Sequence, residues 1–148
     1  MHHLPFHTAH TWLTHLSQLT PPIPLDQIPT IATELGWEPT NLPDEYLYPH
    51  GSDAPRILIH DNDGPQTLYA ASFSLARNLA DDLAGNLTIC DLYTTYIAAA
   101  TTTWGPPTDL STDHTHTIWK LHEHAYINIH MWARSISCNF DTIDPNLG

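Results

Sequence analysis

The chain has 148 residues, of which 41% are hydrophobic, and it carries 16 acidic against only 4 basic residues, a formal net charge of −12. This length and apolar content suit one packed globular domain, so we expect a single domain over residues 1–148. The negative charge repels phosphate backbones and anionic lipid and attracts basic partners, which argues against nucleic acid and membrane binding.

Two helices are predicted near the N-terminus. Residues 7–19 carry apolar side chains three and four positions apart, which places them on one helical face, and Pro21–Pro22 follows. Asp26 is a candidate N-cap for a second helix that runs through Leu35. Gly36 is the residue type that commonly closes a helix.

Three extended segments are predicted next. Residues 45–48 form a short run, residues 56–60 are rich in β-branched residues, and residues 67–75 alternate between two faces. The DNDG sequence at 61–64 is a strong turn signal. Because short connections favour antiparallel neighbours, we expect these segments to pair in that way.

A central helix is predicted over residues 86–104. Asn86 can accept a hydrogen bond from a free backbone N–H of the first turn, and Gly105 followed by two prolines ends the helix. The helix has one apolar stripe, formed by Ile89, Tyr93, Tyr96, Ile97, Ala100 and Trp104.

The last third of the chain predicts an antiparallel meander. Residues 108–114 are a polar loop, and strands are expected at 116–121, 126–131 and 135–140. The fold class is therefore α+β: N-terminal helices, three strands, a central helix and a further meander, with the helices packed on one curved antiparallel sheet.

Within the single domain we expect three parts. The N-terminal helix at 7–19 comes first, residues 25–140 form the core, and residues 141–148 are a loose tail. No apolar run is long enough to span a membrane, and the N-terminus lacks a basic region followed by an apolar block. The sequence therefore predicts a cytoplasmic protein.

Twelve histidines are the most unusual feature of the composition. Imidazoles on one side of a helix or strand can bind zinc or nickel. Three groups have a suitable spacing: His3, His7 and His10 if the first helix begins early, His114 with His116, and His122 with His124. No cysteine accompanies them and the pairs fall near predicted turns, so we favour solvated or packing histidines and expect no metal or cofactor.

Adjacent carboxylates could serve in acid–base catalysis if one were held in a dry pocket. The candidate pairs are Asp44–Glu45, Asp61/Asp63 and Asp81–Asp82. All three fall in predicted loops, which favours solvated carboxylates. A G-x-S-x-G elbow and the glycine-rich phosphate motifs are both missing from the sequence.

The two cysteines, Cys90 and Cys138, are interpreted as small buried hydrophobic residues. Cys90 follows Ile89 in the central helix, so a buried thiol is favoured over a nucleophile. We therefore expect no catalytic residue, and the sequence favours a binding protein over an enzyme.

Three short motifs carry a family resemblance: LGW at 35–37, WGPPT at 104–108 and IWKL at 118–121. They resemble small actinobacterial proteins in which a helix that ends in leucine-glycine-x-proline is followed by a Trp-bearing strand and a β-meander. Some of those proteins lie beside polymorphic or secreted toxins as immunity proteins. The resemblance covers residues 26–140 and implies no catalytic residue. This chain departs from the pattern in its few arginines and many histidines and threonines.

The element order is also similar to that of secretion chaperones and YbjN-like proteins, which hold a client segment and often dimerise. The first resemblance implies an immunity protein that occludes a cognate, basic, enzymatic toxin in a heterodimer. The second implies a secretion-system chaperone or adaptor. Under the first hypothesis the acidic loops supply partner-binding residues, and these are Asp61, Asp63, Asp81 and Asp82.

Overall fold

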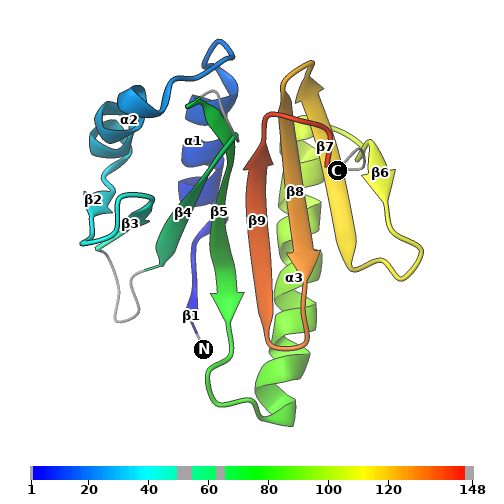
Figure 1. The fold of residues 1–148 in the computed structure, drawn as a ribbon. Helices are drawn as coiled ribbons and strands as arrows, with labels where there is room; N and C mark the ends of the chain where they lie inside the picture. The colour runs from blue at the N-terminus through cyan, green and yellow to red at the C-terminus, as the bar shows by residue number, and fades with distance from the viewer. Residues whose placement is uncertain (1, 50–54, 63–65, 146–148) are drawn as a thin grey trace.

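The computed structural model describes residues 2–49, 55–62 and 66–145 (Figure 1). The helices in these residues are α1 (Phe6–Ser17), α2 (Ile28–Leu35) and α3 (Leu83–Trp104), with the short 3-10 helix η1 (Leu25–Gln27) before α2. The strands are β1 (His2–His3), β2 (Glu38–Pro39), β3 (Glu45–Leu47), β4 (Arg56–Asp61), β5 (Leu68–Arg77), β6 (Asp109–Leu110), β7 (His116–His122), β8 (Ala125–Met131) and β9 (Ser135–Asp141).

All these strands belong to one antiparallel sheet, in which eight follow the order β2-β3-β4-β5-β9-β8-β7-β6 and β1 pairs with β5 outside this order. The fold is α+β, with helices packed on one sheet, as predicted. β5 is the central strand, and β9 pairs with it along most of its length although the two are far apart in the chain. β4 and β1 share the other edge of β5: β4 pairs with residues 68–73 and β1 with residues 76–77 (Figure 1).

α1 and α3 lie side by side behind the sheet in Figure 1 and cover the same face. Trp12 of α1 packs edge-on against Phe73 of β5 and Trp37, with ring centroids 5.0 and 5.4 Å apart. The predicted stripe of α3 faces the sheet: Ile89, Tyr93, Tyr96 and Ala100 are buried, and Ile97 and Trp104 pack against the core. Burial of these large side chains is the main stabilising contribution.

A β-bulge interrupts β5 at Leu75, where the pairing with β9 shifts register. The carbonyl oxygen of Leu75 accepts a hydrogen bond from the Leu4 N–H at 2.7 Å. The buried Tyr96 hydroxyl of α3 donates to the Leu4 and Leu75 carbonyl oxygens, at 2.6 and 3.0 Å. Burial raises the pKa of Tyr96, which keeps the hydroxyl protonated as a donor. This group of bonds ties β1, β5 and α3 together.

The start of α3 differs from the prediction. The N-cap is Asp82, whose carboxylate accepts the Gly85 N–H at 2.7 Å, so the helix begins at Leu83 and not at Asn86. Asn86 instead accepts a hydrogen bond from the Asn78 side chain at 2.9 Å. An aspartate one turn earlier is the better cap, since its charge also interacts favourably with the helix dipole.

The N-terminal helices also differ in their ends. α1 spans residues 6–17 and not 7–19. Asp26 does not cap α2; it lies inside η1, and Gln27 is the N-cap without a side-chain bond. Gly36 does end α2 in the left-handed conformation, with φ at 77°.

Three strands of two residues, β1, β2 and β6, were not predicted, because so short a segment shows no periodicity. The prediction of a loose tail from residue 141 is wrong for its first residues. Asp141 ends β9 and is only 7% exposed, and the buried Thr142 hydroxyl donates to the Tyr69 carbonyl at 2.8 Å.

Cys138 is buried in β9, as predicted, but Cys90 is exposed, so that prediction is wrong. Neighbouring residues of a helix point about 100° apart, and Ile89 takes the inward position. Within the described residues no helix combines the length and apolar character needed to cross a membrane.

Substitution of Tyr96 by Phe tests the bonds at Leu75. The change leaves two buried carbonyl oxygens without this donor, and we expect the free energy of unfolding to fall by about 1–3 kcal/mol. Chemical denaturation measures it. Tyr69→Phe is the control, because the Tyr69 hydroxyl has no hydrogen bond to the described residues; an equal loss in both variants would contradict the role of Tyr96.

Candidate functional site

The sheet face opposite α1 and α3 carries rows of polar side chains where strands β5, β9, β8 and β7 lie next to one another (Figure 1). Residues paired across strands point to the same face, so the register defines these rows. One row is Ser74, Ser137, His130 and His116; the next is Ser72, Asn139 and Asn128; a third is Ala70, Asp141, Tyr126 and Lys120. Such polar groups on a face without helices make it the candidate binding surface.

Three aromatic rings stack at one side of this face. The rings of His116 and His130 lie 4.9 Å apart at 19°, and those of His130 and Trp132 lie 4.0 Å apart at 10°. The Trp132 indole N–H donates to the Ser137 hydroxyl at 3.0 Å, and a His116 ring nitrogen bonds the Asn128 side chain. Trp132 is still 54% exposed, so the stack presents a large apolar side chain in a fixed orientation.

The stack favours neutral histidine. Burial lowers the pKa of His130, the nearby His116 lowers it further, and Asp113 opposes the change. Asp113 lies in the loop before β7, where hydrogen bonds from the side chains of Ser111 and Thr115 lower its pKa to about 2. A negative charge therefore remains beside the stack throughout the ordinary pH range.

Asp141 lies in the third row between Ala70 and Tyr126. Burial raises the pKa of its carboxyl group to about 6, and the Asn128 side chain partly offsets the rise. Its Oδ2 atom has no hydrogen-bond partner in the described part of the chain. The charged form is therefore disfavoured at this position.

The four predicted partner-binding residues do not form one patch. Asp61 ends β4 and pairs with Leu68, the first residue of β5, whereas Asp81 and Asp82 follow the last residue of β5. The ten residues of β5 separate the two ends by about 30 Å. Asp63 lies outside the described residues.

The two groups also differ in their contacts. Asp81 forms an ion pair with Arg134 at 3.4 Å and accepts a hydrogen bond from Asn86 at 3.2 Å. Asp82 caps α3, so both residues have local structural roles. Asp61 is exposed at the end of its strand. Whether any of them contacts a partner stays a prediction.

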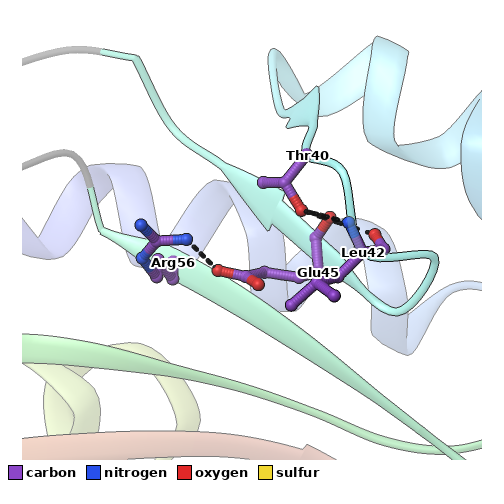
Figure 2. A network of polar contacts seen from close by, with 4 residues as sticks. All are labelled: Thr40, Leu42, Glu45 and Arg56. Carbon is purple, nitrogen blue, oxygen red and sulfur yellow. Dashed lines mark hydrogen bonds and ion pairs between the residues drawn. The ribbon is translucent and has the colours of Figure 1, made fainter.

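The prediction of solvated carboxylates is wrong for Glu45. This side chain belongs to β3, is only 6% exposed, and forms an ion pair with Arg56 of β4 (Figure 2). The turn before it is closed by Thr40, whose hydroxyl accepts the Leu42 N–H at 3.1 Å. Sequence reasoning missed the pair because it depends on the register between β3 and β4.

The first histidine group is not assembled. His3 belongs to β1 and α1 begins at Phe6, so His3, His7 and His10 do not share a helix face. His10 instead stacks near Phe6 and Trp104, with centroids 6.2 and 5.9 Å apart. The described residues contain no group of three or more histidine, cysteine or acidic side chains that could hold a metal ion.

One nucleophile–base pair is present that the sequence did not reveal. The His60 and Ser72 side chains, on β4 and β5, are hydrogen-bonded at 2.9 Å. Among the described residues no carboxylate hydrogen-bonds the His60 ring, so the orienting acid of a triad is not there. The pair joins two strands across the sheet and lacks the third member that such catalysis uses.

Comparison with known proteins places the chain in a family. Residues 7–142 match the model of a family described as a family of unknown function (DUF6301). The chain belongs to this family. No curated protein and no solved structure matches it. The match covers nearly the whole fold, from α1 to the residue after β9.

Asp141→Asn tests the buried carboxyl. The pKa of Asp141 in the folded state is raised above the ordinary value of 3.8. Between about pH 4 and 6 the folded protein therefore binds more protons than the unfolded chain. As a result, the free energy of unfolding falls as the pH rises through that window. We expect Asp141→Asn to raise the free energy of unfolding by about 1–3 kcal/mol at pH 7 and to change it little at pH 4. Urea denaturation measures both, with exposed Asp91→Asn as control. A loss of stability at pH 7 would contradict burial as the cause.

His130→Phe tests the ring stack. Because the folded state lowers the pKa of His130 below 6.5, its contribution to stability is complete above that pH and is lost as pH falls through the folded-state pKa. The phenyl ring keeps the stacking and cannot titrate. We therefore expect a smaller difference in unfolding free energy between pH 7 and pH 5 than in the parent protein. An equal pH dependence in His130→Phe and the parent would contradict the assignment of this dependence to His130. His124→Asn, which changes an exposed histidine, is the control.

Proposed function

We propose that this protein is an immunity protein that binds a basic toxin and blocks it by steric occlusion. The observation that carries the proposal is the distribution of charge. Three of the four basic side chains, Arg56, Lys120 and Arg134, lie in ion pairs with carboxylates. These pairs are neutral, so the net charge of −12 comes from the carboxylates outside them, and it favours a positively charged partner.

Four carboxylates gather at one end of the sheet, which we call the acidic end: the exposed Asp26, Asp61 and Glu123, and the partly exposed Asp144. Asp61 ends β4, Glu123 lies in the turn between β7 and β8, and Asp144 follows β9. The bridge between Pro24 and Thr67 brings η1, with Asp26, to the same end. Contacts between elements far apart in the chain therefore create this charge density.

Lys120 is the basic residue of the acidic end. The ammonium group of Lys120 lies 3.4 Å from the Glu123 carboxylate. The hydrogen bond with Glu123 and its negative charge raise the pKa of Lys120, and the charge of Asp144 adds to this rise. Lys120 therefore neutralises only part of the charge. The remaining carboxylates suit a basic protein surface, and their long-range field would accelerate encounter more than it tightens the final complex.

The first experiment is co-purification with the product of the neighbouring reading frame, scored together with cell survival. A one-to-one complex that rescues cells from that product is the expected result. The acidic end is then tested by Asp26→Lys, Asp61→Lys and Glu123→Lys combined, which should slow association at low salt by about tenfold or more and flatten its salt dependence.

The matched control reverses three exposed carboxylates elsewhere, Glu38, Asp44 and Asp91. It changes the net charge equally, so equal slowing in both variants would show that only total charge matters. Failure to form a complex, with no rescue of the cells, would overturn the immunity proposal.

A secretion chaperone or adaptor is the second candidate, favoured by the outer face of α3. Leu83 and Leu87 are 76% and 57% exposed there, and Asp91 is the only charged residue of the helix. Six threonine hydroxyls of α3 donate to carbonyl oxygens four residues earlier, so these hydroxyls are bonded within the helix itself. A dimer through this face that binds a disordered client would favour the chaperone over the immunity protein.

A further inference from the structure

A cleft opens beside β5, and residues of both β1 and β4 line it. Both strands pair with the same edge of β5 (Figure 1), β4 up to Phe73 and β1 from Ala76. The cleft is lined by residues of both strands and of the segment of β5 between them. Its volume is about 880 Å³, within the range of small-molecule sites. It reaches from the polar face of the sheet to the start of α1 at Pro5 and Thr8.

Two of the four basic residues of the whole chain, Arg56 and Arg77, line this one cleft. In a protein of net charge −12, such a pair is unexpected. Arg77 makes no ion pair with any carboxylate in the part of the chain that the structure describes. Its charge is therefore available to a ligand.

The bulge at Leu75 sets the direction of Arg77. Strict alternation would place residues 73, 75 and 77 together on the helix side, where Phe73 and Leu75 are buried. The extra residue shifts the register, so Arg77 pairs with Ser135 and Ser74 pairs with Ser137. Ser135 and Ser137 are two residues apart on β9 and lie on the same, polar face. The register therefore puts Arg77 on that face, one row from Ser74.

Arg56 approaches from the neighbouring strand. Ile57 pairs with Phe73, which places Arg56 across from Ser74. Its guanidinium bonds the buried Glu45 at one side (Figure 2), while the Arg56 side chain is 63% exposed. A guanidinium has five N–H donors, so the bond to Glu45 fixes its position and leaves donors for a second anion.

The rest of the lining combines hydroxyl and apolar groups. Ser72, Ser74 and Ser137 present hydroxyls on the polar face, and Leu58 and Leu79 border the cleft with exposed fractions of 43% and 50%. Two guanidinium groups with nearby hydroxyls bind oxyanions, and exposed leucines suit an apolar chain.

We propose that this cleft binds an amphiphilic anion, a molecule with a carboxylate or phosphate head on an apolar body. The head lies against Arg77 and Arg56, and the body extends over Leu58, two residues from Arg56 on β4. The site does not depend on the proposed immunity function, because its charge is opposite to that of the acidic end and a basic partner would be repelled from it.

The test is isothermal titration calorimetry of the intact protein with decanoate, decyl phosphate, decanol and inorganic phosphate, each alkyl compound below its micelle-forming concentration. We expect one-to-one binding of decanoate or decyl phosphate and much weaker binding of decanol. Preference between the two anionic amphiphiles identifies the head group. Binding of neither, binding of inorganic phosphate alone, or equal binding of decanol would overturn the proposal.

Arg77→Met removes the charge and keeps an apolar stem. We expect it to weaken binding of the preferred amphiphile by about tenfold or more, as for loss of a charge-assisted hydrogen bond. Arg134→Met, which changes an arginine outside the cleft lining, is the matched control and should bind as the parent does. Equal affinity in Arg77→Met and the parent would overturn the assignment of the head-group site.

A second pair of variants tests the apolar body. Leu58→Asn should weaken decanoate binding more than hexanoate binding, because the longer chain contacts more apolar surface. Leu110→Asn is the control, since Leu110 is equally exposed, at 44%, on the distant strand β6. Both leucines are exposed, so neither variant removes a core residue. If chain length has the same effect in Leu58→Asn as in the parent, the apolar chain does not bind there.

Discussion

The carbonyl group of Leu75 is the contact on which much of this structure depends. Leu75 is an extra residue in the central strand β5. It has no partner residue in the pairing with β9. The Leu4 N–H and the Tyr96 hydroxyl both bond its carbonyl oxygen. A buried carbonyl without such partners would be costly, so the bulge is stable only when β1 and α3 are in place. The same extra residue turns Arg77 to the polar face.

The two ends of the sheet differ in charge because of how the strands are ordered. Antiparallel pairing brings the end of β4, the turn after β7 and the end of β9 together, and each supplies a carboxylate. At the opposite end Asp81 and Asp82 are engaged by Arg134 and by the first turn of α3. The charge that a partner meets therefore depends on topology more than on composition.

The sequence predicts the α+β class and its regular elements well, because long segments show a clear period. The stripe from Ile89 to Trp104 identified α3, and the alternation in 67–75 identified β5. It could not predict β1, β2 or β6, whose two residues have no period. The sequence also does not show the surroundings of single side chains. It predicts a solvated Glu45 and a buried Cys90, and both predictions are wrong because these surroundings depend on strand register and on the rotation of the helix.

The candidate sites show the same limit more strongly. Asp61 and Asp81 look alike in the sequence, yet β5 separates them by about 30 Å. Arg56 and Arg77 look unrelated, yet one cleft brings them together through a single extra residue. A distance of about 30 Å is several Debye lengths at physiological salt, so charges at the acidic end are largely screened from Arg77. Arg56 is closer to the acidic end, since it lies on the same strand as Asp61 and five residues before it, so of the two guanidinium groups Arg77 is the one whose charge is more independent of that end.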